Sequence, residues 1–245
     1  MSPAELAYAA GVLLLAYFIR GIAGFGSGLI AVPLLALMFP LTRVVPFILL
    51  LDFTASLLLG GLNLRKVRWD EAGPLIPFGL IGVALGTTLL VNLPKAPLLM
   101  ALAVFVLIFA IRSLLNLHGE KPVSRWWAAP ASLAGGTVGG LFGTGGPPYV
   151  IYLSHRLKDK GELRATFSGV FFLEGLFRIA SFLTAGLLMS AEVWQSYAMG
   201  LPIALLALYA GSHVHTGITQ AQMTRLIGIL LLVSSVSLFI KAFWN

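Results

Sequence analysis

Long apolar segments alternate with short polar connections along the whole 245-residue chain. The apolar segments cover about residues 4–39, 44–62, 72–92, 97–115, 127–153, 165–188, 194–212 and 224–244. Each approaches or exceeds the roughly 20 residues that a helix needs to cross a bilayer. The pattern predicts an all-α polytopic membrane protein with eight hydrophobic units. No stretch is left over for a separate soluble domain, so residues 1–245 are expected to form one membrane domain.

Glycine clusters interrupt the first and fifth units, which are also the longest. The first contains "RGIAGFGSG" at residues 20–28, and the fifth contains "GGLFGTGG" at residues 139–146. A helix of about 35 residues is about 52 Å long, more than one straight span needs, and glycine weakens it. We therefore predict that each of these two units is a broken helix or a helical hairpin with two short arms.

The glycine clusters belong to a duplication of the chain. Gly21-x-x-Gly24-x-Gly26 recurs 119 residues later as Gly140-x-x-Gly143-x-Gly145. Downstream, "LLLD" and "FFLE" end on equivalent carboxylates 122 residues apart, and three further residues recur at a constant shift of 125. These matches are Asp52 with Glu174, Trp69 with Trp194, Pro77 with Pro202 and Gly86 with Gly211. The pattern predicts two homologous halves of about four units each, repeat 1 over residues 1–118 and repeat 2 over residues 119–245.

Loop charges predict that the two halves face opposite sides of the membrane. The connection "NLRKVRWDE" at residues 63–71 carries three cations, whereas its counterpart "MSAEVWQ" at residues 189–195 carries none. The connections that follow the two broken units show the reverse. The one in the first half carries only Arg43, whereas "SHRLKDKGELR" at residues 154–164 of the second half carries four cations. Because cytoplasmic loops are enriched in Lys and Arg, we expect inverted-topology repeats with both termini outside. Secondary transporters commonly have this plan.

Composition narrows the class further. Hydrophobic residues make up 58% of the chain and charged residues 10%, against about a quarter charged in soluble domains. The net charge of +7 fits loop topology first and attraction of anions second, and we expect no nucleic-acid partner. Without cysteine the chain has no thiol, disulfide or iron–sulfur chemistry, and without a phosphate-binding P-loop it has no ATP-driven motor. No metal site or cofactor is expected.

The glycine breaks are the predicted substrate site. Unpaired backbone groups at membrane depth are tolerated only where protein or a water-filled cavity covers them, and helix N-termini and free amides bind anions. We expect an anion near the midplane, held by the backbone of both breaks and by two guanidinium groups. The predicted substrate-binding residues are Arg20, Gly24, Phe25, Gly26, Ser27, Gly28, Gly143, Thr144, Gly145, Gly146 and Arg178. The alternative is that the glycines form a close-packing helix face.

Charged residues inside the spans suggest coupling to an ion gradient. Asp52 and Glu174 are repeat partners, and intramembrane carboxylates often bind a proton or a sodium ion that drives transport. The alternative is that each satisfies a backbone amide or an arginine. Arg178 follows Glu174 by four residues, so a helix-face ion pair competes with anion binding there. Arg20 could instead extend to the lipid headgroups.

Taken together, these motifs resemble the sulfite exporter TauE/SafE family of bacterial membrane transporters. The resemblance rests on residues 21–28 with Pro33, on the second copy from Gly140 to Pro147, and on the eight-unit length. It implies secondary active transport, as an exporter, of sulfur-containing anions such as sulfite or organosulfonates (sulfoacetate), by alternating access in the bacterial inner membrane. Ser27 departs from the third consecutive glycine that members often have. The implied partners are a small anionic substrate and the lipid bilayer, and a homo-oligomer is compatible with the sequence.

Two other functions compete with transport. An intramembrane hydrolase is suggested by the serine in "GFGSG", but Phe25 replaces the first glycine of the rhomboid-like Gly-x-Ser-Gly pattern. No histidine lies within an apolar segment to accept the serine proton, so we do not expect an enzyme. A non-transporting membrane scaffold is the second alternative. Anion flux in sealed liposomes separates the three functions.

Overall fold

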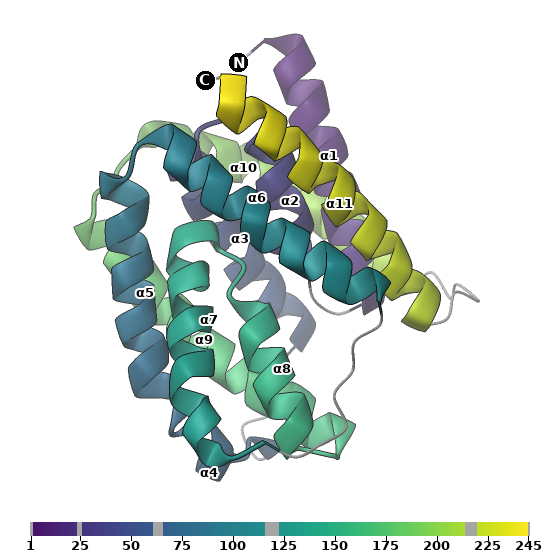
Figure 1. The fold of residues 1–245 in the computed structure, drawn as a ribbon. Helices are drawn as coiled ribbons and strands as arrows, with labels where there is room; N and C mark the ends of the chain where they lie inside the picture. The colour runs from purple at the N-terminus through teal and green to yellow at the C-terminus, as the bar shows by residue number, and fades with distance from the viewer. Residues whose placement is uncertain (1, 24–25, 61–65, 116–122, 214–219, 245) are drawn as a thin grey trace. The chain divides into compact units, whose positions relative to one another are not determined.

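The computed structural model describes residues 2–23, 26–60, 66–115, 123–213 and 220–244, and these residues are almost entirely helical (Figure 1). The helices in chain order are α1 (Pro3–Ala23), α2 (Ser27–Leu35), α3 (Leu41–Gly60), α4 (Trp69–Ala72), α5 (Leu75–Asn92), α6 (Lys95–Leu114), η2 (Arg125–Trp127), α7 (Ala128–Phe142), α8 (Gly146–Arg156), α9 (Lys160–Thr184), α10 (Ala191–His213) and α11 (Gln220–Trp244). No strand occurs in these ranges. The all-α prediction is therefore confirmed.

Both glycine-rich units are broken into two helices. In the first, α1 ends at Ala23 and α2 begins at Ser27 after Gly26, whose φ of 95° is left-handed. In the second, α7 ends at Phe142, followed by Gly143 with a φ of 70°, and α8 begins at Gly146. Within each pair the two helices pack against each other. The prediction of two short arms is wrong for α1, whose 21 residues extend about 32 Å and are long enough to span the bilayer.

Contacts divide the chain into two compact units that each draw on both sequence halves. Unit 1 comprises Met1–Asp52, Leu93–Leu117 and Ser190–Asn245, and unit 2 comprises Phe53–Asn92 and His118–Met189. Helices α1, α2, α6, α10 and α11 belong to unit 1, whereas α4, α5, α7, α8 and α9 belong to unit 2. The boundary falls within α3, directly after Asp52.

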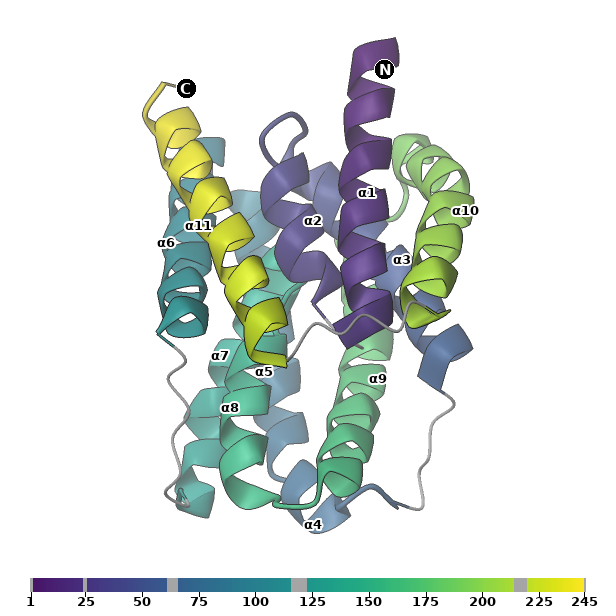
Figure 2. The same cartoon turned by 90° about the vertical axis from the view of Figure 1, so that its right-hand side faces the viewer.

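In unit 1 the main helix pairs are α1 with α10 and α6 with α11, both visible in Figure 2. Glycine allows the first pair to approach closely. A Cβ at Gly21 would lie 2.8 Å from the Cα of Gly211, and one at Gly211 would lie 3.1 Å from the Cα of Gly21. A side chain at either position would force the backbones apart, as in other small-residue helix contacts in membranes.

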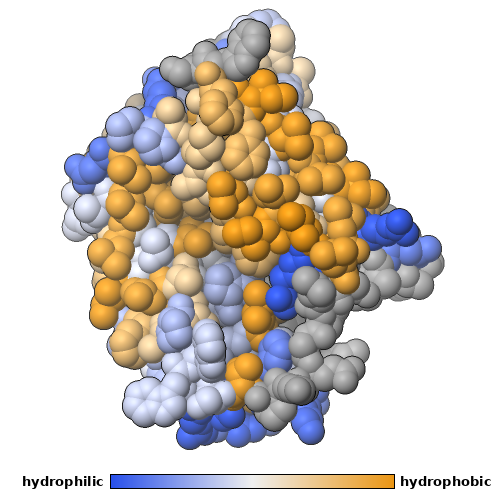
Figure 3. Space-filling view, viewed as in Figure 1, coloured by the Kyte–Doolittle hydropathy of each residue, from blue (hydrophilic) through white to orange (hydrophobic). Residues whose placement is uncertain are grey.

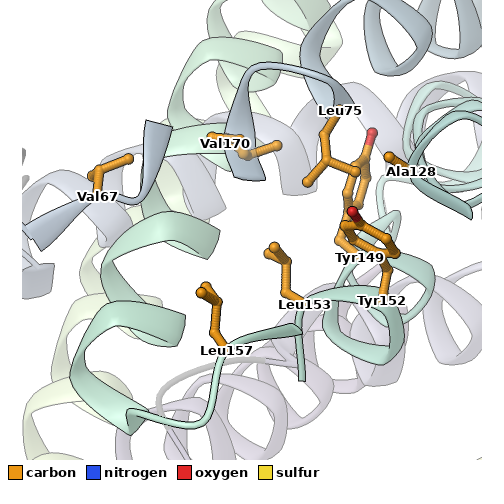
Figure 4. Packing of buried hydrophobic residues seen from close by; sticks show 9 residues of the cluster. Val67, Leu75, Ala128, Tyr149, Tyr152, Leu153, Leu157 and Val170 are labelled. Atoms are coloured by element: carbon orange, nitrogen blue, oxygen red, sulfur yellow. The ribbon is translucent and has the colours of Figure 1, made fainter. Parts of the chain in front are cut away.

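In unit 2 the corresponding pair is α5 with α7. A Cβ at Gly86 would lie 2.8 Å from the amide nitrogen of Leu141, and one at Gly140 would lie 3.0 Å from that of Thr87. The core of the unit gathers side chains of α8 around Leu75, Ala128 and Val170, and Figure 4 shows these side chains together. Tyr149 and Leu153 are fully buried in it.

The outward faces of the helices are apolar, as a lipid environment requires. Six helices of the described residues are long and apolar enough to cross a membrane, namely α1, α5, α6, α9, α10 and α11. Large apolar side chains remain exposed on them, with Ile108 of α6 at 56% and Val233 of α11 at 59%. Figure 3 shows apolar side chains gathered over α6 and α11. Contiguous apolar surface of this extent is rare on soluble monomers, so the chain is a multi-pass membrane protein.

Candidate functional site

Four polar side chains of unit 1 meet at the first glycine break, and we call them the Arg20 cluster: Tyr17 and Arg20 of α1, Ser27 of α2 and Asp52 of α3. Arg20 Nη1 lies 2.6 Å from Asp52 Oδ1 and 2.9 Å from Ser27 Oγ. The hydroxyls of Tyr17 and Ser27 each lie 2.7 Å from the same Asp52 oxygen. Arg20 is only 8% exposed. The cluster therefore ties both helices of the broken unit to α3.

The hydrogens of the Arg20 cluster match an ionised Asp52. Arg20 Nη1 carries two hydrogens, one for Ser27 Oγ and one for Asp52 Oδ1, and the two hydroxyls supply one each. Each of these four hydrogens then has an acceptor, and Asp52 Oδ1 needs no proton of its own. Charge-assisted hydrogen bonds of this kind are among the strongest in proteins.

The repeat-equivalent carboxylate, Glu174, lies in a second cluster in unit 2. This Glu174 cluster comprises Tyr149 of α8, Glu174 and Arg178 of α9, and the backbone carbonyls of Ser132 and Gly143. The Tyr149 hydroxyl contacts Glu174 Oε1 and lies 3.0 Å from the Ser132 carbonyl. Glu174 is fully buried, and its Oε2 has no hydrogen-bond partner among the described residues.

Arg178 reaches the second glycine break. Its Nη1 donates to the Gly143 carbonyl at 3.4 Å, and the residue is only 4% exposed. Glu174 lies one helical turn before Arg178 on the same face of α9 and also feels its charge. A Cβ at Gly139 would lie 3.0 Å from Arg178 Nη2. Gly139 is the repeat equivalent of Arg20, so repeat 2 has no arginine at that position. The guanidinium of the Glu174 cluster comes from α9, whereas that of the Arg20 cluster comes from α1.

The remaining predicted binding residues lie at the two breaks. Gly24 and Phe25 lie outside the described residues. Ser27 and Gly28 are buried in the first turn of α2. In unit 2, Gly145 packs so closely on α7 that a Cβ would overlap the Gly135 carbonyl, and a Cβ at Gly146 would contact Phe167 and Phe171 at 3.5 Å.

Thr144 lies between Gly143 and Gly145 at the same break. It is 7% exposed, and its hydroxyl has no hydrogen-bond partner within the ranges that the structure describes. A buried hydroxyl without a partner costs about 1–3 kcal/mol, so such a group is usually satisfied by a water or a ligand. Together with Arg178, it gives the break in unit 2 two polar groups that suit an anion.

A third polar cluster, which the sequence analysis did not anticipate, closes one end of unit 2. Arg156 of α8 binds Glu71 of α4 through Nη2 at 2.6 Å and Nε at 3.1 Å, and Arg125 Nη2 lies 3.2 Å from the same carboxylate. Glu71 lies outside the spanning segment that starts at Leu75. The hydrogen bonds from Arg156, then from Arg125, hold the pKa of the Glu71 carboxyl below its usual value although burial opposes this.

The two tyrosines were also missed. Tyr149 directly follows the Pro147-Pro148 pair of the second break, and that position was the one available signal. Tyr17 sits three residues before Arg20, on the same helix face, without any motif around it.

Unit 1 also has an apolar pocket of about 60 Å³, separate from the Arg20 cluster. Its lining includes Leu13, Phe47 and Met199, and its one cation, Arg43, is paired with Glu192 at 3.2 Å. No residue of the Arg20 cluster lines it. Its chemistry does not suit a small anion.

Comparison with known proteins identifies relatives. The model of the family described as "Sulfite exporter TauE/SafE" matches residues 9–238. The chain is 31% identical over 194 residues to the protein named "Probable inner membrane transporter protein TsaS" of Comamonas testosteroni, covering 78% of this chain and 80% of that protein. No solved structure gives a significant match.

Proposed function

Since the chain belongs to the sulfite exporter TauE/SafE family of membrane transporters, we propose that it exports small sulfur-containing anions such as sulfite or organosulfonates like sulfoacetate. It is a secondary active transporter of the bacterial inner membrane, with both termini outside. Substrate is held at the glycine breaks, and the breaks open to one side of the membrane at a time. The carboxylates Asp52 and Glu174 couple this cycle to a proton or sodium gradient.

The observation that carries the anion site is the arrangement at the second break. Arg178 donates to the Gly143 carbonyl, and the hydroxyl of the next residue, Thr144, is buried and has no hydrogen-bond partner among the described residues. A sulfonate presents several oxygens in a tetrahedral head, which suits a guanidinium fork plus one hydroxyl. Left-handed Gly143 also turns the chain so that α8 begins immediately after the break. Pro147 and Pro148 in the first turn of α8 carry no N–H, so the helix dipole, and not their amides, adds a favourable field for negative charge.

Reciprocal contacts support inverted repeats. In unit 1, Arg43 of the first sequence half lies 3.2 Å from Glu192 of the second, and in unit 2 Arg68 lies 3.1 Å from Glu162. Each ion pair joins the connection after the broken unit in one half to the following connection in the other half. Inverted halves place those two connections on the same side of the membrane. The glycine contacts are reciprocal too, with Gly21 against Gly211 and Gly86 against Gly140.

Hydrolysis has no support at Ser27. The family and the relative are transporters, not enzymes. The Ser27 hydroxyl donates to Asp52 and accepts from Arg20, so both its hydrogen and its acceptor side are used within the Arg20 cluster. The other alternative, a membrane scaffold that transports nothing, is tested by the flux measurement that follows.

Flux into sealed proteoliposomes tests the proposal. Labelled sulfite, sulfoacetate, thiosulfate and sulfate are compared with taurine, which carries no net charge at neutral pH. We expect protein-dependent flux of at least one sulfur anion. Arg178→Gln removes a charge-assisted contact of about 1.5–3 kcal/mol and should raise the KM roughly ten- to hundredfold.

Arg112→Gln is the matched control, because Arg112 lies in the last turn of the spanning helix α6 and belongs to neither cluster. It should leave the KM near that of the wild type. Vesicles that contain folded protein but show no flux of any anion would support the scaffold. Equal KM values for the two variants would remove Arg178 from the site.

A further inference from the structure

The two repeat-related carboxylates have different hydrogen-bond surroundings. Asp52 Oδ1 lies within 2.7 Å of three donors, one of them the cation Arg20. Glu174 has one contact, between its Oε1 and the Tyr149 hydroxyl, and its Oε2 has no hydrogen-bond partner in the described part of the chain. An ionised carboxylate needs donors on its oxygens to be stable away from water. Asp52 has three donors on Oδ1, whereas the Oε2 of Glu174 has none among the described residues.

Counting hydrogens at Tyr149 leads to the same distinction. Its hydroxyl carries one hydrogen but contacts two oxygens, the Ser132 carbonyl at 3.0 Å and Glu174 Oε1. The carbonyl can only accept, and so can an ionised carboxylate, so the one tyrosine hydrogen serves a single contact at a time. Both contacts have a hydrogen only when the carboxyl group supplies the second one. A protonated Glu174 satisfies both contacts, whereas an ionised Glu174 leaves one of them without a hydrogen.

Ionisable groups near Glu174 are sparse. Helices α5 and α7 and the part of α3 in unit 2 contain no titratable residue. From α8, Tyr149 contacts the carboxyl, whereas Tyr152 and Arg156 bind Glu71 of α4, and His155 contacts the Ile151 carbonyl. Asp70 of α4 binds Arg68. On α9 itself, Arg178 is the charged group that acts on Glu174, and Lys160, Glu162 and Arg164 lie in its first turns.

Gly79 of α5 also closes the site sterically. A Cβ at this position would overlap the Glu174 carboxyl and lie 2.5 Å from the Tyr149 hydroxyl. The carboxyl group is therefore enclosed by Tyr149 and the backbone of α5, away from water, as in other intramembrane proton-binding sites.

We propose that Glu174 alone carries the coupling proton, and that the structure describes its protonated state, while Asp52 stays ionised as the fixed counter-ion of Arg20. This assignment rests on the proposed function and narrows it in two ways, from both carboxylates to Glu174 as the coupling group and from either ion to a proton. The Glu174 carboxylate takes a proton from water on one side of the membrane and returns it to water on the other. Glu174 is protonated in only one of the two states, substrate-bound or substrate-free, and this difference links proton movement to substrate movement.

Glu174→Gln tests the assignment, because the amide imitates the protonated acid and cannot release a proton. For one proton moved per monovalent anion, a pH difference of one unit supports an about tenfold substrate gradient in the wild type. We expect the variant to lose this gradient completely but to keep substrate exchange at equal pH on both sides. Glu192→Gln, which alters an exposed carboxylate, should keep both activities. A Glu174→Gln variant that still builds the gradient, or a wild type driven by sodium instead, would overturn the proposal.

Infrared spectroscopy of the purified protein gives a readout that needs no transport. The carbonyl stretching band of a protonated carboxylic acid should be present in the wild type, absent in Glu174→Gln and unchanged in Glu192→Gln. If the wild type shows this band but no substrate exchange, the proposed function is refuted, whereas the protonated state of Glu174 is retained. Absence of the band from the wild type at neutral pH would refute the assignment itself.

Discussion

Removing one partner of the Arg20–Asp52 pair should destabilise the protein strongly. Arg20→Gln leaves an ionised Asp52 in a cluster whose side chains are 10% and 23% exposed. Breaking a buried pair from one side costs about 3–5 kcal/mol, and the partial exposure of Asp52 favours the lower end of that range. A loss of about 3 kcal/mol lowers the Tm of a chain of this size by roughly 6–12 °C.

The double variant Arg20→Gln with Asp52→Asn separates charge from packing. Both charges are then gone, and the two amides can still hydrogen-bond with Tyr17 and Ser27. We expect it to be more stable than the sum of the single losses predicts, by about 1–3 kcal/mol of coupling. Thermal unfolding in one detergent, followed by the fluorescence of an added dye, measures all the variants.

The Arg43–Glu192 pair of the same unit is the matched control. Its Glu192 side chain is 67% exposed. Surface pairs contribute about 0–1 kcal/mol, so Arg43→Gln should shift the Tm by less than about 4 °C. The reasoning fails if Arg20→Gln is no more damaging than Arg43→Gln, or if the losses of the two single variants simply add.

Three further predictions concern the second glycine break, the Glu71 carboxylate at the end of unit 2 and the orientation of the chain in the membrane. Gly143→Ala and Gly186→Ala both strain a left-handed glycine, at φ values of 70° and 76°, but only the first should impair anion transport at matched protein levels. Because the Glu71 pKa is lowered on folding, its stabilising contribution is present above the unfolded pKa of about 4.3 and is lost as pH falls through the folded value. The Tm of the wild type should therefore fall more steeply below about pH 4.5 than the Tm of Glu71→Gln. If the two Tm values fall in parallel with pH, the Glu71 carboxylate does not stabilise the fold in this way. Since the chain has no cysteine, Ser190→Cys should react with an impermeant maleimide from outside, whereas Ser124→Cys should react only after permeabilisation; the reverse result would contradict the orientation.

Local signals in the sequence were sufficient for the helices and their interruptions. Glycine weakens a helix wherever it stands, so the clusters around Gly26 and Gly143 marked both breaks. The length of α1 was not predictable in this way, because packing against α10 keeps its last turn helical as far as Ala23. Gly21 and Gly211 were recognised as members of the duplication, but nothing in one sequence records that they contact each other.

The candidate site could be predicted only in its parts. Asp52 and Glu174 were found as equivalent positions, yet their surroundings differ because Tyr17, Arg20 and Ser27 converge on the first and only Tyr149 on the second. Helical spacing correctly placed Arg178 on the face of Glu174. It could not predict that the packing of α8 against α7 also brings the Gly143 carbonyl to Arg178. Contacts between helices distant in the chain decide these partners.

A structure determined with bound sulfoacetate, or with the anion that gives the highest flux, would locate the binding site itself. We expect density for the anion at the break between α7 and α8, with its oxygens within hydrogen-bond distance of the Arg178 guanidinium and the Thr144 hydroxyl. Density for the anion elsewhere in the molecule, with both groups satisfied by other protein atoms, would contradict this expectation.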